Sequence, residues 1–301
     1  MELTHTHPSS LSNFSISNFF ISYFLISYFL LLPLSSRAAA SADGSAGGTR
    51  YMQLVQWADE AVAKSDWERA IACLQEAMRT EPANPQNVML MSNTGMIQHY
   101  AGNDSLALRT LTEARAIAPS SVVILKNRAT VLTSLGRPDD AMRDYDMIIQ
   151  MDSTYADAYQ DRAVLFMNLD RYTEAEADIE RYRRLRPKDT HGALMLAVIY
   201  SNTGRAAEAV PLYTELLKSK EEAVYYSARA MCCMVSGDLF SAADDIARGL
   251  ELDPDDAELY FCRAYLNHLR FRDSDRDSDA AKAAALGIDP ARIKALPSLP
   301  R

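Results

Sequence analysis

The apolar and polar positions of the chain follow a pattern that returns at nearly constant spacing. The stretch "SLGRPDDA" begins at Ser134, "NLDRYTEA" begins at Asn168 and "NTGRAAEA" begins at Asn202, so the starts are thirty-four residues apart. Each stretch combines a short polar turn, an Arg, an acidic residue and an Ala. Aligning the recurring Ala residues predicts repeats that start near residues 51, 88, 122, 156, 190, 223 and 257. A period of this length predicts stacked pairs of helices.

Within each repeat, small and large side chains occupy fixed positions. Position 8 holds a small residue, namely Ala58, Gly95, Ala129, Ala163, Ala197, Ala230 or Ala264. Position 20 holds Ala70, Ala107, Ala141, Ala175, Ala209 or Ala242, and position 24 holds Leu74, Leu111, Tyr145, Ile179, Tyr213 or Ile246. Two helices pack closely only where their side chains are small, and a bulky neighbour then fills the space beside them. After residue 50 no sustained alternation of apolar and polar residues predicts a strand.

A proline follows the second predicted helix at position 32 of four repeats: Pro82, Pro119, Pro187 and Pro254. A helix ends before such a residue. Together with positions 8, 20 and 24, this pattern resembles the tetratricopeptide repeat family over residues 51–290. The resemblance implies an all-α fold, a right-handed α-solenoid of about seven antiparallel helix pairs. It also implies that the first helix of each pair lines a concave, ligand-binding face.

The end of the chain departs from this pattern. The stretch "DSDRDSD" (273–279) alternates acidic residues as a calcium loop does. However, Ser278 stands where such a loop needs Gly, and Ala284 stands where it needs Glu. We interpret the stretch as a solvated acidic linker, which would place the second helix of repeat seven out of register. Residues 291–301 are expected to form a C-terminal tail.

The first fifty residues differ in composition from the rest of the chain. Residues 18–34 are almost entirely aromatic and aliphatic, and a run of small residues follows them. This order is typical of a signal peptide (1–42), cleaved before Asp43 and followed by a flexible linker (43–50). It predicts an exported protein in the periplasm, the cell envelope or the medium. No Lys or Arg precedes the apolar run, and an uncleaved membrane anchor at residues 14–34 is the alternative.

Composition and charge narrow the range of functions. The chain of 301 residues has a formal net charge of −9, whereas binding nucleic acid requires surplus Lys and Arg. Its five His and four Cys residues show no metal-ligand or redox spacing. The sequence also lacks a phosphate-binding loop and a nucleophile elbow. We therefore expect no catalytic residue, no metal and no cofactor, and an enzyme is the least favoured hypothesis.

The family resemblance implies that positions 2, 5, 6, 9, 12 and 13 of each repeat face a ligand. On this basis the candidate partner-binding residues are Asn93, Tyr100, Lys126, Asn127, Gln160 and Asp161. The side-chain amides of Asn93 and Asn127 can bond the backbone of an extended peptide, which demands little of its sequence. Further along the chain the same positions become apolar, at Leu194, Met195, Val198, Met231, Met234, Phe261 and Tyr265.

The family's best-known ligand site is a clamp of Lys, Asn and Arg side chains that holds a C-terminal carboxylate. This chain departs from it, with Val55 and Asp59 in repeat one and Val123 and Asn127 in repeat three. The sequence therefore favours a non-catalytic module that binds a protein or an extended peptide by another route. A scaffold subunit of an envelope or secretion assembly is the alternative. Membrane contact is expected only if the N-terminal segment is uncleaved, and the oligomeric state stays open.

Overall fold

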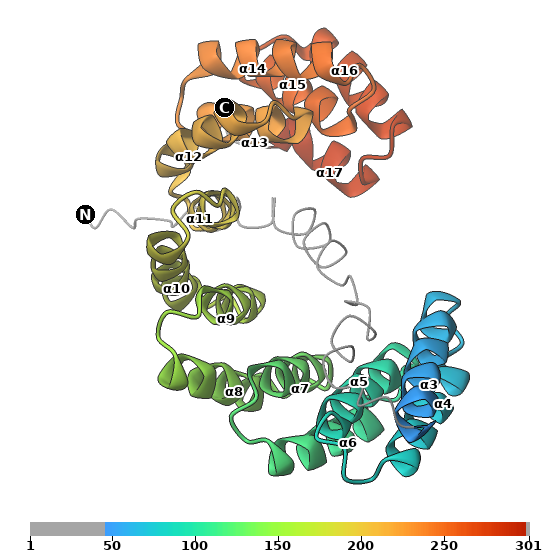
Figure 1. Ribbon diagram of the computed structural model, residues 1–301. Helices are drawn as coiled ribbons and strands as arrows, with labels where there is room; N and C mark the ends of the chain where they lie inside the picture. The colour runs from blue at the N-terminus through green and yellow to red at the C-terminus, as the bar shows by residue number, and fades with distance from the viewer. Residues whose placement is uncertain (1–45, 299–301) are drawn as a thin grey trace, which may run out of the picture. The chain divides into compact units, whose positions relative to one another are not determined.

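The computed structural model describes residues 46–298, with side chains from residue 50 onward. In this range all regular secondary structure is helical and comprises fifteen α-helices and one short 3-10 helix (Figure 1). The predicted signal peptide and its alternative, the anchor, lie outside the described residues. None of the described helices is both long enough and apolar enough to cross a membrane.

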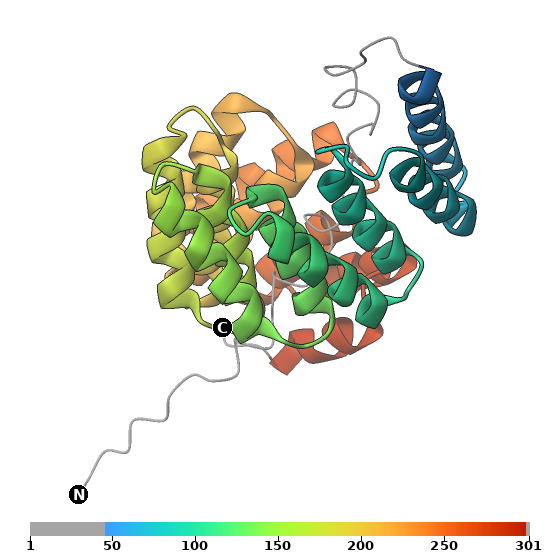
Figure 2. The same ribbon diagram turned by 60° about the horizontal axis from the view of Figure 1, so that its bottom comes forward.

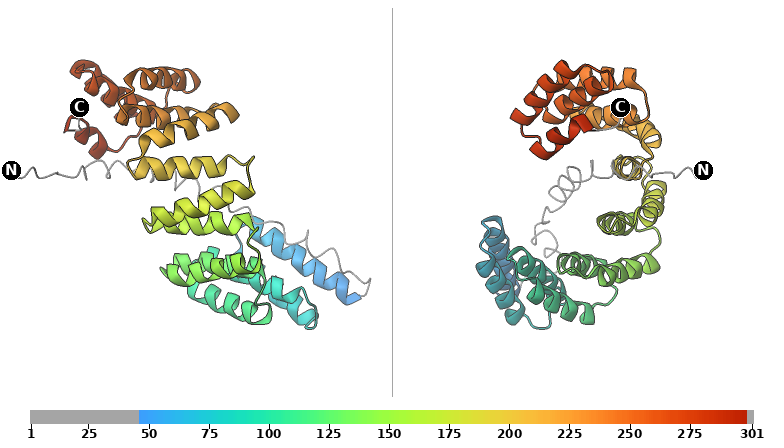
Figure 3. Two further views of the ribbon diagram at one scale, coloured as in Figure 1. Left: turned by 90° about the vertical axis from the view of Figure 1, so that its left-hand side faces the viewer. Right: turned by 180° about the vertical axis from the view of Figure 1, so that it is seen from behind.

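The described helices divide into two compact units, and the boundary in the sequence falls between residues 171 and 172. The N-terminal unit contains α3 (Ala46–Ala63), α4 (Trp67–Thr80), α5 (Asn87–Tyr100), α6 (Asp104–Ile117), α7 (Val122–Ser134), α8 (Pro138–Met151) and α9 (Ala156–Asn168). The C-terminal unit contains α10 (Tyr172–Leu185), α11 (His191–Asn202), α12 (Ala206–Ser219), α13 (Ala223–Val235), α14 (Leu239–Leu252), α15 (Ala257–Leu269), α16 (Asp273–Ala285), α17 (Pro290–Ala295) and the 3-10 helix η1 (Leu296–Ser298). Within each unit, consecutive helices pack against one another in chain order (Figures 2 and 3).

Helix boundaries follow the predicted repeat closely. Four expected starts, at residues 122, 156, 223 and 257, are the first residues of α7, α9, α13 and α15. The second helix of each pair begins sixteen residues after its expected repeat start, at residues 67, 104, 138, 172, 206, 239 and 273. Helix α3 begins earlier than expected, at Ala46, so residues 46–50 are helical and not part of a linker.

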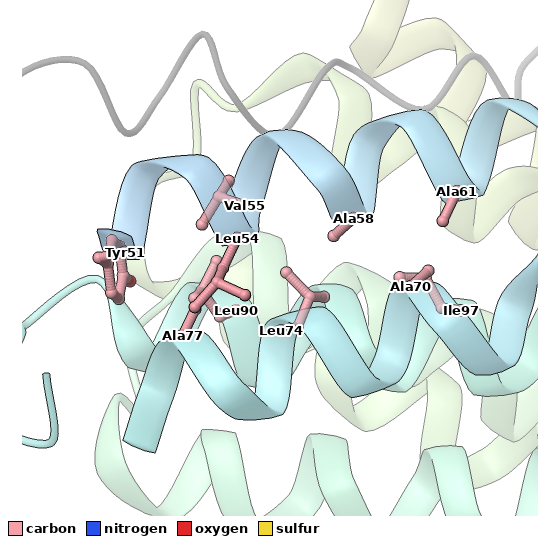
Figure 4. Packing of buried hydrophobic residues seen from close by; sticks show 10 residues of the cluster. All are labelled: Tyr51, Leu54, Val55, Ala58, Ala61, Ala70, Leu74, Ala77, Leu90 and Ile97. Atoms are coloured by element: carbon pink, nitrogen blue, oxygen red, sulfur yellow. The ribbon is translucent and has the colours of Figure 1, made fainter. Parts of the chain in front are cut away.

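Small residues at positions 8 and 20 bring the two helices of a pair together. In the first pair, Ala58 on α3 and Ala70 on α4 are fully buried in one cluster with Leu74 (Figure 4). In the second pair, position 8 is Gly95, and a Cβ atom added there would lie 2.6 Å from Cγ of Leu111. Real Cβ atoms do not approach a neighbour so closely. Helices α5 and α6 can therefore pack at this distance only because Gly95 has no side chain.

Each turn between paired helices contains one residue in the left-handed backbone region, always at position 15 of the repeat. These residues are Ser65, Gly102, Gly136, Asp170, Gly204, Gly237 and Phe271. Gly adopts this conformation without a steric cost, and Asp tolerates it. Phe271 is a bulky exception, with φ of 59° and a side chain that is mostly exposed.

The acidic stretch of the last repeat is not a linker. Residues 273–279 form the first half of α16, which begins in register with the second helices of the other pairs. The carboxylate of Asp279 is buried and accepts hydrogen bonds from Nη2 of Arg263 at 2.6 Å and from Nδ2 of Asn267 at 2.9 Å. These bonds to α15 hold the acidic segment in a helix and offset the loss of hydration of its carboxylate.

The expected C-terminal tail is also structured as far as residue 298. Leu296 is only 1% exposed and packs in a cluster with Phe261 and Ile288. The guanidinium of Arg292 lies 4.4 Å from the ring centre of Phe261 and donates to both carboxylate oxygens of Glu258, at 2.5 and 2.9 Å. Helix α17 and η1 therefore cover the last helix pair, because its apolar surface would otherwise face water.

An ion pair between the two helices of a repeat recurs along the described part of the chain. An Arg at position 7 pairs with an Asp at position 23, sixteen residues later, as in Arg128–Asp144, Arg229–Asp245 and Arg263–Asp279. The sequence prediction missed these pairs although the spacing of sixteen residues was visible. The spacing indicates a contact only once the register between the two helices is known. That register places positions 7 and 23 opposite each other on the paired helices.

Candidate partner-binding surface

The candidate residues lie on α5, α7 and α9, the first helices of three successive pairs in the N-terminal unit. Nδ2 of Asn127 donates to Oγ of Ser92 at 3.0 Å. Nζ of Lys126 lies 2.8 Å from Oδ2 of Asp161. We refer to Ser92, Asn127, Lys126 and Asp161 as the polar ladder, and to each bonded pair as a rung. Ser92 is fully buried, so in its rung only Asn127 can meet a ligand.

The repeat period explains the rungs. Both pairs join position 5 of one repeat to position 6 of the next, and both are thirty-five residues apart in sequence. The period is about thirty-four residues. A residue thirty-five positions later in the sequence therefore lies in the next repeat, one position further along its first helix. Residues at these two positions therefore face one another between consecutive first helices. Ser92 was expected at a ligand-facing position, but its bond to Asn127 was not predicted, because a serine on a helix does not indicate its partner by itself.

The charged rung is partly buried, with 29% of the Lys126 side chain and 22% of the Asp161 side chain exposed. Burial lowers the pKa of Lys126, but Asp161 outweighs that effect, so the pKa is raised and the ammonium stays charged. Burial raises the pKa of Asp161, and Lys126 opposes that rise. The ring centre of Tyr155 lies 5.9 Å from Nζ and adds a cation–π contact. Groups of the protein itself thus hold the ammonium in place.

The other three candidate residues do not belong to the ladder. Asn93 is half-buried on α5. Tyr100 packs on Trp67 of α4 with ring centres 6.1 Å apart, and burial raises the pKa of its hydroxyl. Gln160 is only 3% exposed, so its amide does not lie at an open surface. Of the six residues predicted to face a partner, the structure brings three together.

The expected apolar continuation in the C-terminal unit is not an open groove. All of its residues except Met231 are buried: Leu194, Met195, Val198, Met234, Phe261 and Tyr265. Met234 and Tyr265 belong to one core cluster, and Phe261 packs beneath α17 and η1. The expectation of an apolar binding surface there is wrong, because these side chains pack into the core of the unit.

Three of the four cysteines, Cys232, Cys233 and Cys262, are buried in surroundings that disfavour the thiolate. Burial raises the pKa of Cys232 and of Cys233 to about 11 and raises that of Cys262 well above its ordinary value. The attacking species is the thiolate, which such an environment disfavours. Between residues 46 and 298, no group of three or more His, Cys, Asp or Glu side chains is placed to hold a metal ion.

The described residues form stacked pairs of helices, and a comparison with known families identifies the family to which these repeats belong. Residues 55–122, 126–190 and 161–224 match the model of the family described as Tetratricopeptide repeat. These matches cover more than half of the chain, which therefore belongs to the tetratricopeptide repeat family. Proteins with this fold are suited to protein–protein interaction, and the resemblance inferred from the sequence is confirmed.

One similar protein of known sequence is the human DnaJ homolog subfamily C member 7. The chain is 28% identical to it over 141 residues, which cover 42% of this chain and 28% of the human protein. The chain thus spans less than a third of that relative's length.

Two solved structures share the fold. A tetratricopeptide repeat protein from Parabacteroides merdae is 27% identical, with a TM-score of 0.60, and the match covers 83% of this chain and 98% of that one. YrrB, described as a TPR protein with an unusual peptide-binding site, is 20% identical, with a TM-score of 0.52 and coverage of 63% and 98%. At 20% identity the second likeness shows the fold alone.

Proposed function

We propose that the N-terminal unit binds an extended segment of a partner protein along the polar ladder, without catalysis. The observation that carries this proposal is the line of polar groups on α5, α7 and α9, the first helices of three successive repeats. Asn127 uses one N–H on Ser92, which leaves its second N–H and its carbonyl oxygen for a ligand. Lys126 likewise has further N–H donors beyond its bond to Asp161. An extended backbone offers the matching donors and acceptors at regular spacing.

The family supports this proposal. YrrB, a protein of the same fold, is described as having a peptide-binding site. In the present chain the clamp positions hold Val55 and Asp59 in repeat one and Val123 and Asn127 in repeat three, so recognition would rely on the peptide backbone and on the two rungs. That mode needs little sequence specificity from the ligand beyond its charge.

Two experiments test the proposal: capture of binding partners, and measurement of their affinity for the wild-type protein and its variants. Full-length tagged protein captures partners from an extract of the native cells, and mass spectrometry identifies them. Calorimetry then compares the wild-type protein with Asn93→Ala/Asn127→Ala, which removes the ladder amide of Asn127 together with the amide at the same position of the preceding repeat. Each lost bond should cost about 0.5–1.5 kcal/mol of binding, so the double variant should bind about five- to a hundredfold more weakly.

The matched control is Ser92→Ala. It removes the same internal hydrogen bond as Asn127→Ala but leaves the amide available to a ligand. This variant should retain the wild-type affinity within about threefold, since the amide is then less constrained but still present. Unchanged partner affinity in a well-folded Asn93→Ala/Asn127→Ala protein would contradict the proposal that a partner segment binds along the polar ladder.

A scaffold subunit is a second candidate, and one observation favours it. Phe240 is 84% exposed and Phe271 is 71% exposed in the C-terminal unit. Their turns belong to neighbouring repeats and are linked by Nη2 of Arg270, which donates to the carbonyl of Leu239 at 2.8 Å. Exposed aromatic side chains of this size mark contact surfaces. Loss of co-purifying subunits in Phe240→Ser/Phe271→Ser, but not in the Asn93→Ala/Asn127→Ala variant, would favour this candidate.

We also propose that the protein is exported, on the composition of residues 1–42. Sequencing the N-terminus of the native protein tests this point, and a mature chain that begins near residue 43 supports it. An intact chain that resists carbonate extraction from membranes would support the anchor at residues 14–34 instead.

A further inference from the structure

A pocket of about 360 Å³ lies between α6, α7 and α8 of the N-terminal unit. Small-molecule sites occupy about 300–1,000 Å³, so this volume suits a small organic ion or a single side chain of a partner. The lining is mostly charged and includes three Arg and three Asp residues: Arg115, Arg128, Asp140, Arg143, Asp144 and Asp146. No residue of the polar ladder lines the pocket, so a site here is independent of the proposed function.

Every carboxylate of the lining already has an Arg partner. The pairs are Asp140 with Arg137 and with Arg143, Asp144 with Arg128, and Asp146 with Arg162. Two of these cations, Arg137 and Arg162, lie outside the lining. The negative charge of the pocket is therefore balanced without Arg115.

Arg115, on α6, is half-buried and is paired differently from the other cations of the pocket. Its Nη2 donates to Sδ of Met147 at 3.0 Å, and a thioether is a weak acceptor. Among the residues that the structure describes, none supplies a carboxylate that forms an ion pair with Arg115. A guanidinium has five N–H donors in a planar fork that matches a carboxylate. Most of the hydrogen-bonding capacity of Arg115 therefore remains for a ligand.

The buried base of the pocket also has unmet hydrogen bonds. Nη2 of Arg128 donates to Oδ1 of Asp144, but Nε of Arg128 and Oδ2 of Asp144 are buried without a hydrogen-bond partner. In the equivalent pair of repeat six, Nε and Nη2 of Arg229 each bond one oxygen of Asp245. Buried polar atoms without a partner are rare, and a bound ion or water commonly accounts for them.

The charge at this base is shared between helices. Burial raises the pKa of Asp144, while Arg128 and, more weakly, Arg115 oppose that rise. Arg115 thus acts on Asp144 without forming an ion pair with it. An anion that binds Arg115 does not have to break any ion pair of the protein, and it loses only the contact with Met147.

We propose that this pocket is a binding site for a carboxylate group, which Arg115 holds through its guanidinium. Arg143 and Gln150, both exposed at the pocket, can add donors to the same ligand. A carboxylate fits better than a phosphate, because phosphate carries more than one negative charge near neutral pH and the three Asp residues repel the additional charge. An acidic side chain of a protein segment and a free organic acid share this chemistry.

Three small probes test the proposal with the full chain, each titrated by ligand-observed NMR at about 0.15 M salt. They are N-acetylglutamate N-methylamide, its uncharged glutamine counterpart, and propionate, which is a free acid that resembles the glutamate side chain. The glutamate probe should bind at least about fivefold more tightly than the glutamine probe. Tighter binding of the glutamate probe than of propionate supports a protein segment as the ligand, and equal binding of the two supports a free organic acid.

Matched variants assign the binding to Arg115. Arg115→Gln should weaken the glutamate probe by about five- to thirtyfold, and Arg115→Lys, which keeps the charge but loses the fork, should weaken it less. Arg109→Gln removes the same charge from an exposed position of α6 outside the lining, and should change the affinity by about twofold or less. A melting curve for each variant verifies that it is folded.

Three results would overturn the proposal: equal affinity of the wild-type protein for the glutamate and glutamine probes, tighter binding of inorganic phosphate than of the glutamate probe, or equal losses in Arg115→Gln and Arg109→Gln. The Asn93→Ala/Asn127→Ala variant should bind the glutamate probe as the wild-type protein does. A loss of that binding in the double variant would place the carboxylate at the polar ladder and would contradict a separate pocket.

Discussion

Nε and Nη2 of Arg229 donate to the two carboxylate oxygens of Asp245, at 2.9 and 2.6 Å, so that the side chains form a fork between α13 and α14. Nη1 of Arg229 donates in addition to Oγ1 of Thr214 on α12, at 2.9 Å. One guanidinium thus connects three consecutive helices of the C-terminal unit, within one pair and across to the previous pair.

Removing the carboxylate of this fork should be costly. Asp245 is only 2% exposed, so Asp245→Ala leaves the Arg229 charge unpaired in a mostly buried place. We expect a loss of about 3 kcal/mol in the free energy of unfolding, measured by urea denaturation. Glu251→Ala is the control, since Glu251 pairs with Arg248 on the exposed surface and should lose about 0.5 kcal/mol or less. Equal losses in the two variants would contradict the structural role of the fork.

Relieving the backbone strain at Phe271 should stabilise the protein. A non-glycine residue in the left-handed region lowers the free energy of unfolding by about 1–2 kcal/mol. Replacing it with Gly removes this strain, but the greater freedom of Gly in the unfolded chain lowers the free energy of unfolding by about 0.5–1 kcal/mol. Phe271→Gly should therefore gain about 0.5–1 kcal/mol, seen as a higher melting temperature. Phe271→Ala removes the same ring but keeps a Cβ at φ of 59°, and should gain less than Phe271→Gly. If the two variants melt at the same temperature, the backbone carries no strain at this turn.

Filling the close contacts between paired helices should destabilise the fold. Gly95→Ala places a Cβ 2.6 Å from Cγ of Leu111, and Ala141→Leu adds volume at a fully buried site. We expect each to cost about 1–3 kcal/mol in thermal or chemical unfolding. Arg137→Ala, on the exposed turn next to Ala141, should change stability by about 0.5 kcal/mol or less. The reverse ranking would show that positions 8 and 20 are assigned incorrectly.

The loop before α11 should contribute stability that depends on pH. Burial raises the pKa of Asp189, but the hydroxyl of Tyr182, at 2.5 Å, and the backbone N–H of His191, at 2.9 Å, outweigh it and hold the pKa below its ordinary value of 3.8. Because the folded-state pKa is the lower one, the contribution is present above about pH 4 and is lost as the pH falls through the folded value.

Comparing the wild-type protein with Asp189→Asn isolates this contribution. The difference in unfolding free energy should be largest above about pH 4 and should shrink at lower pH, where the carboxyl group of the folded protein is also protonated. Urea denaturation between about pH 2 and pH 7 measures it. A difference that stays constant over this range would show that the carboxylate charge is not what stabilises the loop.

The helix pairs were predictable from the sequence because their determinants are local and repeated. Close packing needs a small residue wherever two helices touch, and residues such as Ala58 and Ala70 therefore return at a fixed period. The acidic stretch at 273–279 was misinterpreted for the opposite reason. Its composition is that of a solvated segment, and the bond from Arg263 that keeps Asp279 buried comes from another helix.

The candidate surface was predictable only in part. The structure places Ser92 and Lys126, at position 5, against Asn127 and Asp161, at position 6 of the next repeat, but which side chains bond each other depends on the spacing between neighbouring helices. The Asn127 amide was expected to bond a peptide backbone, and part of its hydrogen-bonding capacity goes to Ser92. Gln160 has the polarity of a surface residue, and nothing in its local sequence indicates that it is buried.

The C-terminal cover formed by α17 and η1 occupies the apolar flank of the last helix pair that the structure describes. Phe261 is already packed against Leu296 and Ile288, so a helix pair added after residue 298 would find no apolar flank to stack on. A helix pair inserted before residue 257 would have a helix pair of the same repeat on each side, against which its apolar flanks could pack. Growth of this protein by duplication of repeats is therefore confined to the region ahead of its last pair. The length of partner segment that such a chain can accommodate would change with duplications there and not at its C-terminus.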